Sequence, residues 1–248
     1  MKNFWEAKDV GDNTDFSWEI GQLKLLLKGK ETEWSIKHIL DNKDDNLWER
    51  WIGTNNVKQV SLRPIMPDLP LVVKSSSPVV IIPNSEIQIY ISIPLFVKLE
   101  LSNNSIEGIN EYATIPLSQT WFGDAMVGSH AYSLKTEIYE TLNEITSENN
   151  QVICPILVKN ITKKPFRFER LCLHVEHLSI YEMEQKLYAD SLKVSYRGEE
   201  GFSKIEYSPG IDDFSKKLKL IEKSRNPIQK SIFKRSFSEF QNFHGFQL

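Results

Sequence analysis

The amino-acid sequence predicts a mainly β protein, an antiparallel β-sandwich or barrel-like pair of sheets with one or two C-terminal α-helices. Every odd position from Ile87 to Leu101 is apolar, and a period of two is typical of a strand with one buried face. Shorter alternating segments recur before and after this stretch. Beyond residue 210 the apolar spacing changes to three or four, which is typical of an amphipathic helix.

The longest alternating stretch, residues 85–101, is too long for one ordinary strand. At about 3.3 Å per residue it would extend roughly 55 Å, several times the usual strand length. Pro94 lies near its middle and has no N–H group to donate to a neighbouring strand. We therefore expect two strands that meet at Pro94, where the chain passes from one sheet to another.

The chain divides into three parts. Residues 1–15 are polar and acidic, which predicts a loose N-terminal arm. Residues 16–210 form the β-sandwich core, in which the segment from Arg63 to Pro70 contains three prolines in eight residues and predicts a stiff, extended connector. A change of apolar phase within residues 166–175 predicts a β-bulge near Glu169 and Arg170.

Residues 211–248 predict a basic, Phe-rich helical tail. Asp212 is a suitable N-cap, and Asn226 followed by Pro227 marks a second helix start. A basic amphipathic helix docks into a partner groove or lies on a membrane surface, whereas the alternative is a helix folded back onto the sandwich. We expect the tail to contact a protein partner, a second copy or a membrane surface through Lys230, Phe233, Lys234, Arg235, Phe237 and Phe240.

Composition narrows the possible classes of protein. The net charge of −3 produces no field that favours nucleic acid, so we expect no nucleic-acid partner. No phosphate loop, dinucleotide fingerprint or nucleophile elbow occurs, and we expect no cofactor. The N-terminus shows no secretory signal, no apolar run approaches a membrane span, and Cys154 and Cys172 are too few for a disulfide framework. These features favour a reducing cytoplasm, with both cysteines as buried thiols.

One group of residues on loops and strand ends is a candidate binding surface. Charged side chains beside aromatic residues on stiff loops are typical of recognition sites. The alternative is structural, with the two aromatic residues plugging the end of the sandwich and the charged residues capping loop backbone groups. The candidate residues are Arg63, Asp68, Trp121, Phe122, Asp124 and His130.

Cys172, His174 and His177 are soft metal ligands close together in the sequence. On a continuous strand Cys172 and His174 share one face, and His177 points to the other. A zinc site needs a fourth ligand and side chains that converge. We therefore expect no metal site here.

Several stretches together resemble the domain of unknown function 432 family of prokaryotic proteins. The resemblance extends over most of the chain and weakens in the first 15 residues and in the tail. It implies no catalytic residues, and it implies an association with small mechanosensitive channels, as for some relatives. The stretches are Trp18-Glu-Ile-Gly-Gln-Leu23, Arg63-Pro-Ile-Met-Pro-Asp-Leu-Pro70, Ile91-Ser-Ile-Pro-Leu95, Pro116-Leu-Ser-Gln-Thr-Trp-Phe-Gly-Asp124, Cys154-Pro-Ile, Phe168-Glu-Arg-Leu-Cys-Leu173, His177-Leu-Ser-Ile-Tyr181 and Tyr196-Arg-Gly198.

From these observations we expect a non-catalytic binding or assembly protein. One specific role is an accessory subunit of a membrane channel of the mechanosensitive type. Such a protein would be cytoplasmic and peripheral to the inner membrane. The alternative is a hydrolase-like enzyme with a site around Arg63, Asp68, Asp124 and His130.

Overall fold

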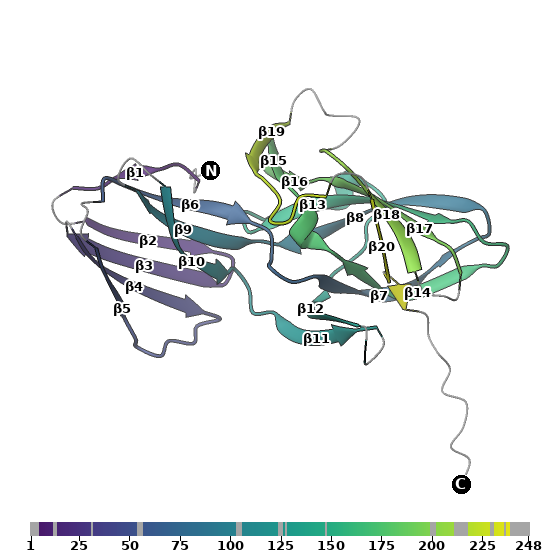
Figure 1. Ribbon diagram of the computed structural model, residues 1–248, viewed down its shortest axis with the longest axis horizontal. Helices are drawn as coiled ribbons and strands as arrows, with labels where there is room; N and C mark the ends of the chain where they lie inside the picture. The colour runs from purple at the N-terminus through teal and green to yellow at the C-terminus, as the bar shows by residue number, and fades with distance from the viewer. Residues whose placement is uncertain are drawn as a thin grey trace, which may run out of the picture.

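The computed structural model of the protein shows a chain built of β-strands in four sheets (Figure 1). The mainly β prediction is confirmed, and most neighbouring strands are antiparallel. Among the described strands three pairs are parallel, namely β12 with β7, β13 with β16 and β13 with β17. The structure describes residues 5–11, 14–30, 32–53, 57–102, 106–123, 126, 128–146, 148–198, 202–210, 218–228, 231–235 and 237–238.

Two sheets enclose a first hydrophobic core, and we call this part the first lobe. One sheet is a meander of β2 (Thr14–Ile20), β3 (Leu23–Lys30), β4 (Glu33–Leu40) and β5 (Glu49–Ile52). The other has the order β1 (Lys8–Asp9), β6 (Gln59–Ile65), β9 (Phe96–Ser102) and β10 (Ile106–Ala113). Alternate apolar side chains of both sheets are buried between them, among them Trp18, Leu25, Ile36, Leu62 and Leu99.

The other two sheets enclose a larger core, and we call this part the second lobe. One sheet has the order β11 (Ser118–Phe122), β12 (Ser129–Lys135), β7 (Leu71–Ile81), β14 (Phe166–Leu173) and β21 (Phe237–Ser238). The other has the order β19 (Lys219–Glu222), β15 (Ile180–Met183), β16 (Lys186–Ala189), β13 (Gln151–Asn160), β17 (Ser191–Tyr196), β18 (Phe202–Ser208) and β20 (Ser231–Arg235). Strand β8 (Ser85–Pro94) pairs with β13 along its whole length.

Strands β8 and β9 join the two lobes, as the alternating stretch predicts. Ile89 and Ile93 of β8 are buried in the second core, whereas Val97 and Leu99 of β9 are buried in the first. The expectation of two strands that meet at Pro94 and belong to different sheets is confirmed. The apolar period is unbroken through the junction because both strands turn the same side of the chain toward a core.

Backbone hydrogen bonds fix the crossing between the lobes. Leu95, between β8 and β9, donates its N–H to the carbonyl of Asn150 at 2.8 Å and accepts a hydrogen bond from the N–H of Thr114 at 3.3 Å. The carbonyl of Thr114 accepts a hydrogen bond from the N–H of Gln22 at 2.8 Å, which attaches the β2–β3 turn to this crossing. Trp5 packs against both cores.

The predicted C-terminal helices are wrong. Within the described part of residues 211–248 the chain forms strands: β19 pairs with β15, β20 with β18 and β21 with β14. The predicted N-cap Asp212 and the tail residues Lys230 and Phe240 lie outside the described residues. The backbones of Phe233, Lys234 and Arg235 belong to β20 and that of Phe237 to β21. A short helix is marginal alone, so hydrogen bonding to the edges of β18 and β14 overrides the local helical spacing.

Short helical turns occur at two places in the described chain, Leu142–Glu144 and Val175–His177. The second follows β14, whose predicted bulge is confirmed by a shift of register against β7 between Phe168 and Arg170. None of the helical segments that the structure describes has the length and apolar character needed to span a membrane.

Candidate functional site

The structure separates the predicted aromatic pair Trp121 and Phe122. Consecutive residues of a strand point to opposite faces. Phe122 is 5% exposed and packs with Val72, Ala131 and Cys172 in a small cluster of its own. Trp121 is 50% exposed. The structural interpretation therefore fits Phe122, and the binding interpretation fits Trp121.

Trp121 lies opposite His130 in the β11–β12 register, and Gln119 lies opposite Tyr132. These four residues share one face of the β11–β12 ribbon, which we call the Trp121 face. Tyr132 packs at the margin of the second core, while Trp121 and His130 are exposed. The face of this sheet that covers the core therefore extends beyond the core, where it carries the exposed Trp121.

Asp68 belongs to the same region because the hydroxyl of Tyr132 donates a hydrogen bond to its carboxylate at 3.0 Å. Burial and this acidic partner raise the pKa of Tyr132 to about 12. The phenol is thus a neutral donor that holds the proline-rich connector against β12. Asp124, the other predicted carboxylate, lies outside the described residues.

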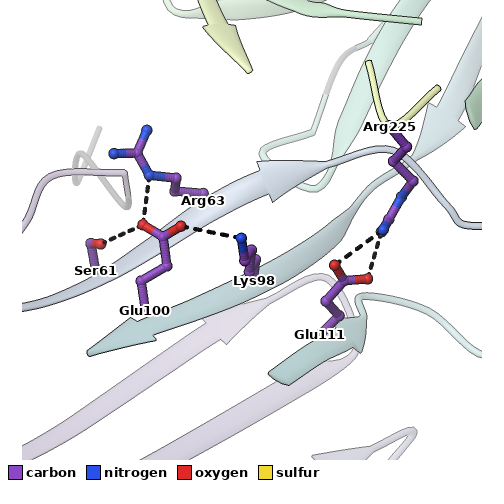
Figure 2. A network of polar contacts seen from close by, with 6 residues as sticks. All are labelled: Ser61, Arg63, Lys98, Glu100, Glu111 and Arg225. Carbon is purple, nitrogen blue, oxygen red and sulfur yellow. Dashed lines mark hydrogen bonds and ion pairs between the residues drawn. The ribbon is translucent and has the colours of Figure 1, made fainter. Parts of the chain in front are cut away.

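Arg63 lies on β6 in a separate network (Figure 2). Its Nε donates to Oε2 of Glu100 at 2.7 Å, and Lys98 Nζ lies 3.6 Å from the other carboxylate oxygen. The Glu100 side chain is 5% exposed, and a buried carboxylate is costly unless it is paired. Arg63 compensates that charge. Arg63 and Asp68 thus have different partners, and His130 is a surface residue of β12.

A second ion pair, which sequence reasoning missed, connects distant parts of the chain (Figure 2). Arg225 follows β19, and its two terminal nitrogens donate to the carboxylate oxygens of Glu111 on β10 at 3.1 and 2.6 Å. Its Nε donates to the carbonyl of Met66 in the connector at 2.7 Å. The partners are 114 residues apart, and no local pattern links them.

The edge strand β5 of the first lobe also carries an exposed tryptophan, Trp51, beside a core position. In β5, Trp51 lies opposite Trp34, which is buried in the first core. Every residue of β5 is exposed. The preceding loop and the segment before β11 border an open hollow of about 670 Å³, lined by His38, Leu40, Asp41, Asn42, Lys43, Asp44, Asp45 and Pro116.

His174, Glu176 and His177 form a cluster at the end of β14. The turn Val175–His177 follows directly, with the N–H of His177 donating to the carbonyl of His174 at 3.2 Å. One carboxylate oxygen of Glu176, Oε1, lies 3.2 Å from Nδ1 of His174 and 3.5 Å from Nε2 of His177. His174 and Glu176 are buried. The expectation that His177 points away is wrong, because the strand ends at Leu173 and the turn redirects His177.

Polar groups lie on the partly exposed side of the cluster. Nδ1 of His177 bonds to the carbonyl of Asn226 at 2.7 Å. Burial acts to raise the pKa of Glu176. Hydrogen bonds from His174 and from the backbone, together with the charges of the two histidines, outweigh burial and hold the pKa of Glu176 below its ordinary value. Burial and the Glu176 carboxylate together raise the pKa of Tyr207, whose ring meets that of His177 edge-on at 5.8 Å.

The family model described as protein of unknown function (DUF432) matches residues 4–241 of the 248-residue chain. The chain belongs to the DUF432 family. The resemblance found in the sequence motifs is therefore confirmed. No significant match occurs among curated proteins or among solved structures.

In this DUF432 protein both cysteines of the family-like motifs are buried. Burial raises the pKa of the Cys154 thiol far above its ordinary value, so the thiol is neutral and unreactive. Cys172 packs with Phe122, on the side of β14 opposite to its core-facing neighbours Leu171 and Leu173. The prediction of buried thiols is confirmed.

Proposed function

We propose that this DUF432 protein is a non-catalytic binding and assembly protein that holds a partner along strand β11. The observation that supports the proposal most directly is the composition of β11, Ser-Gln-Thr-Trp-Phe, at the end of its sheet. It contains no charged residue and no proline, and it exposes Trp121. Natural proteins usually protect edge strands with charges, prolines or bulges, so an edge without them is suited to pair with another chain.

Apart from β21, which consists of only Phe237 and Ser238, the other strands at sheet ends in the described chain differ from β11. Each contains at least one charged residue, including Glu49 and Arg50 in β5 and Glu107 and Glu111 in β10. The same holds for β1, β2, β19 and β20. The partner that fits β11 is therefore an extended protein segment. Its backbone would extend the sheet, and an apolar side chain would cover Trp121 beside His130.

The family resemblance adds a candidate for the partner, a membrane channel of the mechanosensitive type. In that role the protein is a cytoplasmic accessory at the inner membrane. Residues 226–248 are a second proposed contact, with a partner or a second copy. Truncation after residue 238 retains β20 and β21, so it tests association through the last ten residues without removing a described strand.

The proposal is tested by site-specific cross-linking in native lysate, followed by mass spectrometry. A photoreactive residue in place of Gln119 should capture one predominant protein or a second copy of this chain. Capture should fall at least about tenfold when Trp121→Ala is added, because a central aromatic anchor contributes about 2 kcal/mol or more. Trp51→Ala on the charged edge β5 is the matched control and should leave capture unchanged. Equal capture by the wild type and the Trp121→Ala variant would rule out the β11 edge.

A further inference from the structure

The His174–Glu176–His177 cluster has a composition and geometry that the proposed binding function does not use. The donor atoms of the three side chains all lie within 4.8 Å of one another. Two imidazoles and one carboxylate are a common ligand set for zinc and for other first-row transition metals. We propose that His174, Glu176 and His177 bind one divalent transition-metal ion, with zinc as the ion that fits the ligand set best.

The His174–Glu176 hydrogen bond is long, and both distances suit side chains that share one ion. Charge-assisted N–H···O bonds are usually about 2.7–2.9 Å long, whereas Glu176 Oε1 lies 3.2 and 3.5 Å from the two histidine nitrogens. Ligands about 2.0–2.1 Å from a tetrahedral zinc ion are separated from each other by roughly 3.4 Å. The two contacts therefore match the edges of a zinc coordination tetrahedron.

The second nitrogen of His177 orients the ring for binding. Nδ1 lies 2.7 Å from the carbonyl of Asn226, which can only accept, so Nδ1 carries the proton. Nε2 then turns its lone pair toward Glu176 Oε1. A metal ion between Nε2 and Oε1 would bind both of these electron-rich atoms as ligands. Metal-bound histidines typically donate their other N–H to a backbone carbonyl in this way.

Glu176 provides an independent sign of a ligand. Its side chain is 9% exposed, and its second oxygen, Oε2, has no hydrogen-bond partner in the part of the chain that the structure describes. A buried carboxylate oxygen without a donor is costly. The hydroxyl of Tyr207 beside the cluster is likewise buried without a hydrogen-bond partner among the described residues. A tetrahedral ion would take water as its fourth ligand.

The site has a structural consequence for the C-terminal segment. The N–H of Asn226 donates to the carbonyl of Glu176 at 2.9 Å, and the carbonyl of Asn226 accepts a hydrogen bond from Nδ1 of His177. Asn226 adjoins Arg225, which clamps Glu111 and Met66. An ion that fixes the turn Val175–His177 would thus stabilise the attachment of residues 218–228 to both lobes. This predicts a metal-dependent melting temperature.

Zinc binding is measured on the full chain without a histidine tag, after chelator treatment, by competition with a chromophoric zinc indicator. We expect one zinc ion per chain with a Kd of about 1 µM or tighter. His177→Ala and Glu176→Gln should each weaken binding by at least about tenfold. His130→Ala removes an exposed histidine elsewhere and should leave the Kd unchanged.

Two further readouts keep the test decisive. Cobalt in place of zinc should give the visible spectrum of a tetrahedral site, and Glu176→Gln should change that spectrum. Zinc should raise the melting temperature of the wild type but not that of Glu176→Gln. This variant retains the size of the side chain, so it serves as the test variant if His177→Ala fails to fold. Absence of saturable binding at about 100 µM zinc, or equal affinity in the wild type and Glu176→Gln, would overturn the assignment.

Discussion

The guanidinium of Arg225 donates two hydrogen bonds to the carboxylate of Glu111, and its third nitrogen donates one to the carbonyl of Met66. We call this arrangement the Arg225 clamp. One side chain thus joins the C-terminal segment, the last strand of the first lobe and the connector between the lobes. A planar guanidinium suits this arrangement because its fork matches a carboxylate while its Nε remains available.

Removal of this clamp should destabilise the protein. We expect Arg225→Ala to lower the free energy of unfolding by about 1–3 kcal/mol, because the hydrogen bonds are charge-assisted and the side chain is partly buried. Arg225→Lys should recover only part of the loss. Urea unfolding measures both, and Arg50→Ala, which breaks the exposed pair with Glu33, is the control with an expected cost of about 0–1 kcal/mol. A cost for Arg225→Ala no larger than that of Arg50→Ala would contradict the clamp.

Gly21 should tolerate no side chain. It has a φ of +59°, and an added Cβ would meet the side chain of Asn150 and the carbonyl of Thr114. Both belong to the crossing between the lobes. We expect Gly21→Ala to cost at least about 2 kcal/mol. Gly198 also has a positive φ, but open space surrounds it, so Gly198→Ala should cost less. Thermal melts compare the two, and equal losses would show that packing at Gly21 contributes nothing.

The inward side of β8 should not accept a charge. Ile89 is 1% exposed in the second core, and Ile89→Asp would bury a carboxylate without a partner. We expect a loss of about 4 kcal/mol or more. Tyr90→Ser on the other side of the strand should be milder. Chemical denaturation measures the two variants, and a melting temperature for Ile89→Asp equal to that of the wild type would refute the assigned face.

Alkaline pH should weaken the contact between Tyr132 and Asp68. The pKa of Tyr132 is raised from 10.0 to about 12 in the folded protein, so the folded state favours the protonated phenol. The stabilisation is complete below about pH 10 and is lost as the pH rises through about 12. Urea unfolding across this interval should show a smaller loss of stability for Tyr132→Phe than for the wild type. Identical pH profiles would exclude Tyr132 as a contributor.

The sequence predicted the parts of the fold that depend on local periodicity. The alternation through Ile89 and Val97 locates both β8 and β9, and Pro94 marks their junction. The same reasoning failed for Phe233 and Phe237, since their spacing fits a helix but β18 and β14 offer edges that a short segment can join. Pairing partners distant in sequence decide such segments, and a single sequence does not reveal them.

In the candidate sites, too, the sequence alone did not reveal which side chains meet. Trp121 is exposed as the binding hypothesis requires, but its neighbour Phe122 is buried because strand geometry places the two on opposite faces. His174 and His177 converge through a three-residue turn that the alternation of β14 does not indicate. Arg225 and Glu111 meet only in the folded chain, so neither residue is distinctive in the sequence.

Backbone amide exchange of strand β11 shows directly whether a partner pairs with that strand. Hydrogen–deuterium exchange is measured for the protein alone and with the partner captured through Gln119. A chain that pairs with β11 must form hydrogen bonds along its outer edge, so residues 118–122 should exchange more slowly in the complex. The charged edge β5 should be unchanged. Protection elsewhere, with unaltered exchange in residues 118–122, would contradict recognition through β11.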